Sequence, residues 1–191
     1  MSNLNPALSL ISSFAPLSAE SADLLDSIMT EAVYSRNTIL LEIGQIPFRF
    51  HFVKKGLARI YYIRGEEDVT DYFAIDNQFI GAVPALFTGK PSHKAIQVLE
   101  DSEIISFRYS DFEELCASKH DIEHAGRKMA LFGFLEGQQR VESIRFLSAR
   151  ERYEELERKY PGIANRAPLK YIASYLGITQ VSLSRIRAGT Q

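Results

Sequence analysis

Residues 169–187 read Leu-Lys-Tyr-Ile-Ala-Ser-Tyr-Leu-Gly-Ile-Thr-Gln-Val-Ser-Leu-Ser-Arg-Ile-Arg. Gly177 falls where a turn between two helices needs a left-handed backbone, which costs little only for glycine. Thr179 follows as the N-cap of a second helix, and Ala173 leaves room for the two helices to approach. The positions where crossed helices need apolar contact hold Ile172, Leu176, Ile178, Leu183 and Ile186. The stretch therefore predicts a helix-turn-helix.

The charge distribution suggests what this motif binds. Residues 140–191 carry ten basic and five acidic side chains, whereas residues 1–139 carry twelve basic and nineteen acidic ones. A basic module suits a polyanion, because neutralised phosphates release their counterions. We therefore expect residues 148–191 to form a helix-turn-helix domain that binds DNA, with Ser148 as an N-cap and residues 163–167 as a connector. A protein partner is the alternative target for this tail.

The preceding segment, from Asp121 to about Leu147, contains no proline and carries apolar side chains near three- and four-residue steps. This pattern is typical of one long amphipathic helix, which has to bury its apolar stripe. A second copy of the chain is the simplest partner, and packing on the chain's own body is the alternative for part of the stripe. We expect residues 120–147 to be a dimerisation helix. Its expected contact residues are Ile122, Ala125, Met129, Phe132 and Leu135.

Residues 1–119 have a different character. Residues 7–31 are expected to be helical, with a helix start near Ser18 or Ser21, and residues 84–89 to form one helical turn. Between residues 33 and 107, short β-branched and aromatic runs alternate with turn residues, which indicates an antiparallel sandwich or barrel. The expected fold is α+β: a β-barrel with flanking helices over residues 1–119, a long helix and a small all-α domain.

Composition excludes several protein classes. The 191 residues have a formal net charge of −2, one cysteine and no apolar run long enough to cross a membrane. The first residues lack a secretory signal, so we expect a cytoplasmic protein. The sequence contains no phosphate-loop lysine motif, no Gly-x-Ser-x-Gly and no His-Glu-x-x-His. We therefore expect neither an enzyme nor a metal site.

The order of barrel, long helix and helix-turn-helix resembles the Crp/Fnr family of bacterial transcription regulators. The most specific parts of the resemblance are Phe79-Ile80-Gly81, Pro91-Ser92 and the stretch from Lys170 to Arg187. The resemblance implies a jelly-roll barrel of the cyclic-nucleotide-binding type that acts as a sensor. It also implies a homodimer, an inverted-repeat DNA operator and RNA polymerase as a candidate partner.

The resemblance also assigns roles within the helix-turn-helix. Base edges in the major groove would be read by Gln180, Val181 and Arg185, because glutamine, valine and arginine suit adenine, a thymine methyl group and guanine. Phosphates would be contacted by Lys170, Thr179 and Ser182. Many family members add a β-hairpin wing after this helix. The sequence ends at Thr190-Gln191 without one, so we expect DNA binding to depend more heavily on the dimer.

The effector pocket departs from the family pattern. By the resemblance, it would be formed by Gly81, Ala82, Val83, Ser92, His93 and Lys94. Where cyclic-nucleotide-binding members have a glutamate for the ribose and an arginine for the phosphate, this sequence has Ala82 and Ser92. We therefore do not expect cyclic AMP to bind in the usual mode. The expected pocket either is empty or serves another small effector.

Overall fold

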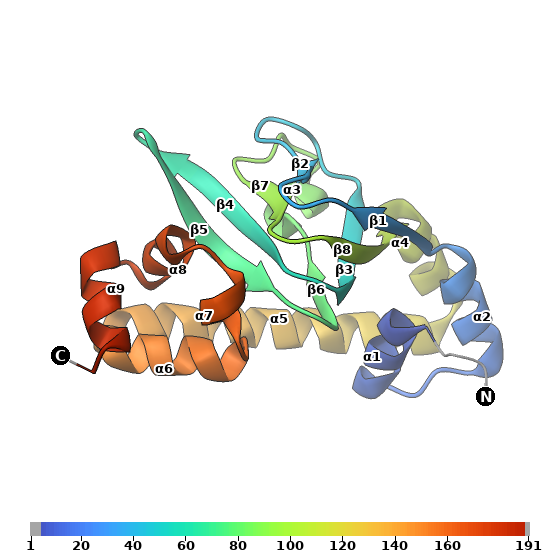
Figure 1. Cartoon of the computed structure of the whole chain (residues 1–191). Coiled ribbons are helices and arrows are strands. Elements are labelled where there is room, and N and C mark those ends of the chain that lie inside the picture. Colours follow the sequence, from blue (N-terminus) through green and yellow to red (C-terminus); the bar gives the residue numbers. More distant parts are fainter. Residues whose placement is uncertain (1–4, 190–191) are drawn as a thin grey trace.

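The computed structural model describes residues 5–189 and combines two β-sheets with helices of four to 27 residues around them (Figure 1). The strands are β1 (Thr30–Tyr34), β2 (Ile39–Leu41), β3 (Arg49–Lys55), β4 (Ala58–Arg64), β5 (Glu67–Ala74), β6 (Gln78–Ile80), β7 (Ala95–Val98) and β8 (Ser102–Arg108). The helices before the long one are α1 (Pro6–Phe14), α2 (Ala19–Ser27), α3 (Val83–Thr88) and α4 (Tyr109–Ser118). The others are α5 (His120–Phe146), α6 (Ala149–Lys159), α7 (Ile163–Arg166), α8 (Leu169–Leu176) and α9 (Gln180–Arg187).

The strands form two antiparallel four-stranded sheets, in the orders β1-β8-β3-β6 and β2-β7-β4-β5. Apolar side chains from both sheets, among them Val53, Ile80, Ile96 and Ile104, meet between them in one buried cluster. Alternate residues of a strand point to opposite faces, so each sheet keeps a second face for the helices. The expected antiparallel jelly roll is confirmed. The strands at β1 and β6, which have few apolar residues or are very short, were not predicted.

The N-terminal helical prediction is partly wrong. The predicted helical region is divided into two helices, because the backbone becomes extended at Ala15 just before Pro16. Ser18 is the N-cap of α2 and accepts a hydrogen bond from the Ser21 amide, as expected near that position. The last two residues of the predicted helix, Thr30 and Glu31, pair with β8 instead.

The long helix α5 runs along the whole molecule, below both sheets (Figure 1). Its first turns pack with α1 and α4 in a core that contains Leu8, Ile11, Phe112 and Ile122. Its other end leads into α6, and the two helices meet at Leu147. Gly126 allows the close packing with α4, because a Cβ there would lie 3.0 Å from the Phe112 ring.

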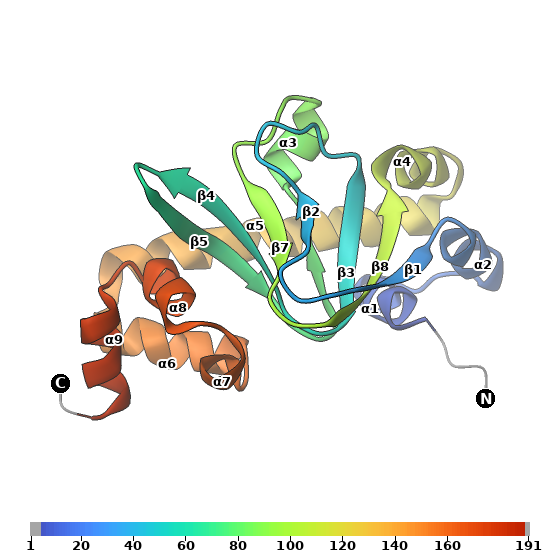
Figure 2. The same ribbon diagram turned by 45° about the horizontal axis from the view of Figure 1, so that its top comes forward.

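The C-terminal helices pack against the outer face of the β4-β5 sheet (Figure 2). One buried cluster joins Phe73 of β5, together with Leu57 and Leu99 beside the ends of β4 and β7, to Ile172 and Tyr175 of α8. Residues 163–167, predicted to be a connector, contain the helix α7. Ile163 is 0% exposed in the shared cluster, and this contact fixes a turn that sequence propensity alone did not indicate.

Candidate nucleic-acid interface and effector pocket

The helix-turn-helix is built as the sequence predicts. Gly177 ends α8 with φ 68°, and its amide donates to the carbonyl oxygens of Ala173 and Ser174. The Thr179 side chain caps α9 and accepts a hydrogen bond of 3.1 Å from the Ser182 amide. The side chains that hold the two helices together are buried, namely those of Ile172, Ala173, Leu176, Leu183 and Ile186.

The opposite face of α9 is open to solvent. Gln180 and Arg185 are exposed, and the Val181 side chain is 63% exposed. Val181 and Arg185 are four residues apart and therefore share one face of the helix. The three side chains expected to read bases thus lie on the surface, with Gln180 and Val181 in the first turn of α9 and Arg185 in its last turn.

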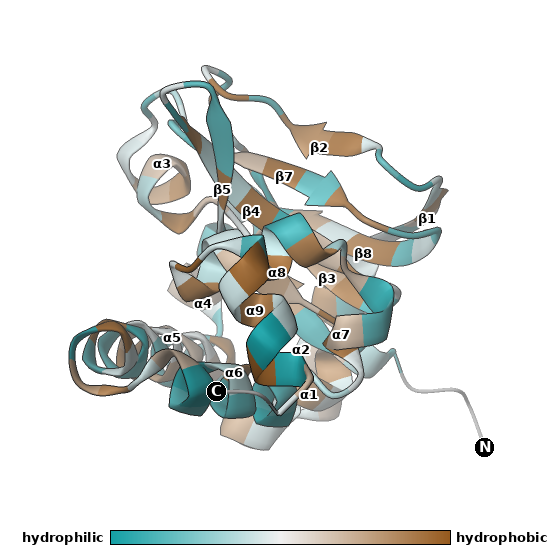
Figure 3. Cartoon of the chain, turned by 60° about the vertical axis from the view of Figure 1, so that its left-hand side comes forward, coloured by the Kyte–Doolittle hydropathy of each residue, from teal (hydrophilic) through white to brown (hydrophobic). Residues whose placement is uncertain are grey.

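Two of the three residues expected at phosphates lie at the N-terminal end of α9. Ser182 and Thr179 are joined by a 3.0 Å hydrogen bond between their hydroxyl oxygens, whereas Lys170 is exposed on the first turn of α8. The first turn of α9 contains no acidic residue. Because the amides of a helix N-terminus carry a partial positive charge, this end of α9 can attract an anion. Figure 3 shows α6 beside it as strongly hydrophilic.

A buried arginine ties α8 to the barrel. Arg59 of β4 is 1% exposed, and its guanidinium carbon lies 3.4 Å from the centroid of the Tyr171 ring and 4.1 Å from that of Tyr61. Its charge is balanced by Asp68, at 2.8 Å. Ser174 of α8 accepts a hydrogen bond of 3.1 Å from the backbone amide of the neighbouring strand β5. The first helix of the motif is therefore fixed on the sheet by specific polar contacts as well as apolar ones.

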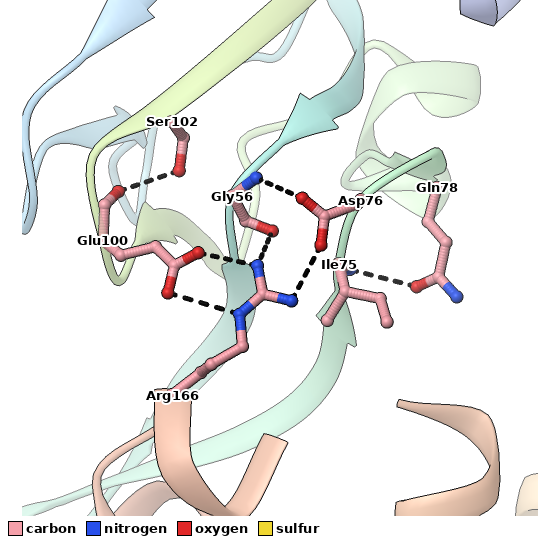
Figure 4. Close-up of polar contacts among 7 residues, drawn as sticks. All are labelled: Gly56, Ile75, Asp76, Gln78, Glu100, Ser102 and Arg166. Carbon is pink, nitrogen blue, oxygen red and sulfur yellow. Dashed lines mark hydrogen bonds and ion pairs between the residues drawn. The ribbon is translucent and has the colours of Figure 1, made fainter. Parts of the chain in front are cut away.

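A second arginine ties α7 to the barrel (Figure 4). The Arg166 guanidinium lies 2.8 Å from Asp76 and 2.6 Å from Glu100, and donates to the Gly56 carbonyl at 2.7 Å. Partial burial acts to raise the pKa of Asp76, but the Gly56 amide and the Arg166 guanidinium outweigh it and hold that pKa below its ordinary value. Sequence analysis did not single out Arg59 or Arg166, since neither lies in a motif.

The junction between the long helix and the C-terminal helices is organised by Arg152 and Arg140. Ser148 and Glu151 form the capping box that begins α6. Arg152 donates to the Leu147 carbonyl at 2.7 Å and, from its Nε, to the last carbonyl of α8. Arg140 of α5 lies over the Tyr175 ring at 3.8 Å and donates to its carbonyl oxygen. These contacts link α5, α6 and α8 beside an open groove of about 720 Å³.

The residues expected to form an effector pocket lie around α3 and the start of β7. Ala82 precedes α3 and is 3% exposed, Gly81 is half-buried, and Val83 is 45% exposed. The Ser92 hydroxyl donates to the Lys94 carbonyl at 2.7 Å and accepts from the Lys94 amide. The Lys94 ammonium lies 2.6 Å from Asp71, and His93 is exposed. The Ser92 hydroxyl and the Lys94 ammonium, which could each bind an anion, are thus both bonded within the chain.

A cavity of about 420 Å³ lies elsewhere in the barrel, between β2, β3 and β7. Its polar lining includes His51, whose Nδ1 lies 2.8 Å from the Ser106 hydroxyl. Burial, assisted by the charge of Arg49, lowers the pKa of His51 to about 4. The six residues expected to form a pocket do not line this cavity. The full lining consists of Leu40, Leu41, Gln45, Ile46, Pro47, Phe48, Arg49, His51 and Ile96.

The residues expected at a dimer contact divide into two groups. Ile122 and Ala125 are 0% exposed in the chain's own core, and Met129 packs against the same cluster. Phe132 and Leu135 are each 51% exposed, although the Phe132 ring also lies 5.5 Å from that of Phe14. The structure leaves further apolar side chains of α5 exposed: Leu131, Phe134, Val141, Ile144 and Phe146.

Within residues 5–189, no three His, Cys, Asp or Glu side chains come together in a way that could hold a metal ion. None of the helices in that range combines the length and the apolar character that a membrane span requires.

Comparison with known proteins relates this architecture to regulators. The sequence model of the cyclic nucleotide-binding domain matches residues 31–119, and no curated protein matches the sequence. The structure of FixK2 from Bradyrhizobium japonicum has a TM-score of 0.69 and 18% identity, and the match covers 85% of this chain and 84% of that chain. A putative crp/fnr-family transcriptional regulator from Eubacterium rectale has a TM-score of 0.68 and 15% identity, with 93% and 87% covered. The Catabolite Activator Protein of Thermus thermophilus has a TM-score of 0.58 and 18% identity, with 97% and 86% covered. At these low identities, the TM-scores show a shared fold.

Proposed function

We propose that this chain, which carries a cyclic nucleotide-binding domain on the fold of the Crp/Fnr regulators, is a homodimeric, sequence-specific DNA-binding transcription regulator. The observation that carries the proposal is the exposed face of α9. Gln180, Val181 and Arg185 stand in solvent there, while Leu183 and Ile186 hold the helix to the rest of the motif. A regulator of this kind is not an enzyme and acts in the cytoplasm, where RNA polymerase is a candidate partner.

Each residue expected to contact DNA has a chemical role in this proposal. Arg185 binds a guanine through two parallel hydrogen bonds, Gln180 an adenine, and Val181 a thymine methyl group. Lys170, Thr179 and Ser182 contact phosphates and fix the register on the duplex. The positive end of α9 and its acid-free first turn support this assignment.

Dimerisation places two such helices on one DNA molecule. Leu131, Phe134 and Leu135 are each more than half exposed, and their spacing of three and four residues puts them on one face of α5. This face points away from the buried Ile122 and Ala125, so a second α5 can cover it. A two-fold dimer presents its recognition helices about 34 Å apart and therefore selects an inverted repeat.

The barrel acts as the sensor in this proposal, and cyclic AMP does not bind to it in the usual mode. The Ala82 side chain has no group that could accept a hydrogen bond from a ribose hydroxyl, and the Ser92 hydroxyl is already bonded to the backbone of Lys94. The orientation of the α9 helices would then be set by another small molecule, or it would not depend on an effector.

In vitro selection from random duplex DNA at low salt tests the function. We expect an enriched inverted repeat with half-sites about one helical turn apart. Arg185→Ala should then cost roughly 1–3 kcal/mol at one base step and relax specificity there. Lys170→Ala is the matched comparison, since the loss of a phosphate contact weakens binding to all sequences alike. A uniform loss in Arg185→Ala would contradict its base-reading role.

The alternative is a tail that binds a protein partner rather than DNA. The exposed Val181 would suit such a contact as well as a thymine methyl group. Failure of the folded dimer to enrich or retain any duplex, with and without effector candidates, would exclude DNA binding and favour this alternative.

A further inference from the structure

The cavity between β2, β3 and β7 is also lined by the loop that joins β2 to β3. Figure 2 shows these three strands close to one another. Leu40, Leu41 and Ile96 line it from one sheet, and Arg49 and His51 from the other. Its volume of about 420 Å³ falls within the usual range of small-molecule sites. The cavity is separate from the residues around α3 that the family resemblance pointed to.

The walls are mainly apolar. Besides Leu40, Leu41 and Ile96, they include Pro47 and two side chains at the opening, Ile46 and Phe48, which are 55% and 60% exposed. Large apolar side chains exposed beside an apolar cavity suit a ligand whose body is also apolar. A nucleotide would instead bury its ribose and base polar atoms against carbon, which costs free energy unless each finds a partner.

Arg49 gives this apolar cavity one positive charge. Arg49, His51 and Val53 lie two residues apart along β3, so their side chains point to the same face of the sheet. Because Val53 belongs to the buried cluster between the sheets, this is the interior face. In the part of the chain that the structure describes, the guanidinium of Arg49 has no carboxylate partner. Its polar contact is a hydrogen bond of 3.4 Å to the Thr30 hydroxyl.

His51, the other titratable residue of the cavity wall, is uncharged. Its side chain is 7% exposed, and Ser106 engages one ring nitrogen. Because the pKa of His51 is about 4, the ring carries no charge at neutral pH and leaves Arg49 as the one cation on the wall. A cation against apolar walls matches a ligand with one anionic head, and the planar guanidinium matches a carboxylate in particular.

We propose that this cavity binds a small molecule with an apolar body and a single carboxylate. The carboxylate binds the Arg49 guanidinium beside His51, and the apolar body lies against Leu40, Leu41 and Ile96. The site does not depend on whether the chain binds DNA, so it stands or falls separately from the proposed function.

Isothermal titration calorimetry on the full chain tests the site, with octanoate as the probe. We expect one octanoate per chain. We also expect 1-octanol, which has the same body without the charge, to bind at least about tenfold more weakly, as the loss of one charge-assisted hydrogen bond implies. Arg49→Met keeps an unbranched apolar stem without the charge and should weaken octanoate binding by a similar factor. Arg64→Met, at the exposed end of β4, is the matched control and should leave binding unchanged.

Three results would overturn the proposal: no binding of octanoate to the wild-type chain, equal binding of octanoate and 1-octanol, or unchanged octanoate binding in Arg49→Met. The comparison of the two ligands uses the wild-type chain, so it remains decisive even where a variant fails to fold. Competition by cyclic AMP for the octanoate site would likewise count against a site of this chemistry.

Discussion

His51 is a residue whose surroundings override its ordinary chemistry. Burial is the larger cause and the charge of Arg49 the smaller one, and together they lower the pKa of His51 from 6.5 to about 4. Between these two values the unfolded chain binds a proton at this residue and the folded chain does not. The free energy of unfolding therefore falls as the pH falls from 6.5 toward 4, by up to about 1.4 kcal/mol per pH unit from this residue.

Replacement of His51 by glutamine should remove that contribution. His51→Gln keeps a group that can hydrogen-bond with Ser106 but does not titrate. Urea unfolding at pH 7 and pH 5 should show that wild-type stability relative to the variant drops by about 1–2 kcal/mol at the lower pH. The exposed His93→Gln serves as the control and should follow the wild type. Parallel pH profiles for wild type and His51→Gln would show that His51 is not buried as a neutral ring.

Gly56 also depends on its surroundings, because they leave no room for a side chain. Its φ is +123°, and a Cβ would lie 2.1 Å from the Ser102 hydroxyl oxygen. Gly56→Ala should therefore lower the free energy of unfolding by roughly 2–5 kcal/mol through backbone strain and overpacking. Gly65→Ala is the matched control, because Gly65 has φ +65° but open space around it, and it should cost only about 1–2 kcal/mol. Urea unfolding measures both, and equal losses would mean that Ser102 yields without cost.

Among the elements, the helix α8 takes part in two contacts, one on each face. It is the first helix of the helix-turn-helix, and its other face is part of a core shared with the β4-β5 sheet. Arg59 between Tyr61 and Tyr171, and Ser174 on the β5 backbone, make this contact specific in position. A movement of the sheet would therefore be passed to α8 directly, rather than through the junction after α5 alone.

The tie between α7 and the barrel can be tested at Arg166. Arg166→Met removes the contacts to Asp76, Glu100 and the Gly56 carbonyl, and should lower the free energy of unfolding by roughly 1–3 kcal/mol. Hydrogen–deuterium exchange should become faster in α7 and α8, since they lose an anchor on the sheet. Arg158→Met is the control, because the Arg158 side chain is 75% exposed and its single ion pair is 3.9 Å long. Unchanged exchange in Arg166→Met would show that the apolar core alone holds these helices.

At the scale of the whole molecule, α5 carries the proposed contact between two chains. The face with Leu131, Phe134 and Leu135 is exposed along the middle of the helix, whereas Ile122 and Ala125 are used within the chain. The proposed dimer contact therefore lies farther along the helix than sequence spacing suggested.

A charge on that face should separate the two copies. Leu131→Glu combined with Phe134→Glu would place carboxylates in an apolar contact, and light scattering should report the mass of one chain instead of two. Ile63→Glu, at a site that is 52% exposed on β4, is the control and should remain a dimer. A dimer that persists in the double variant would place the interface elsewhere.

The sequence by itself determined the local structure of this protein. Gly177, Thr179 and Ser148 fix helix ends through backbone conformation and capping, which depend on near neighbours in the chain, and all three are confirmed. The alternating apolar runs likewise predicted antiparallel sheets, and the jelly roll and the resemblance in fold to Crp/Fnr regulators are confirmed. The roles in binding DNA, a partner chain and an effector remain predictions.

Contacts between residues far apart in the sequence became visible only in the folded chain. Arg59 meets Tyr171, and Arg166 meets Asp76 and Glu100, across more than sixty residues of chain, and no local pattern marks such pairs. The same holds for α7, which is fixed by burial of Ile163, and for the outward face of α5. Helical spacing shows which residues share a face, but burial against α1 and α4 determines which face remains for a partner.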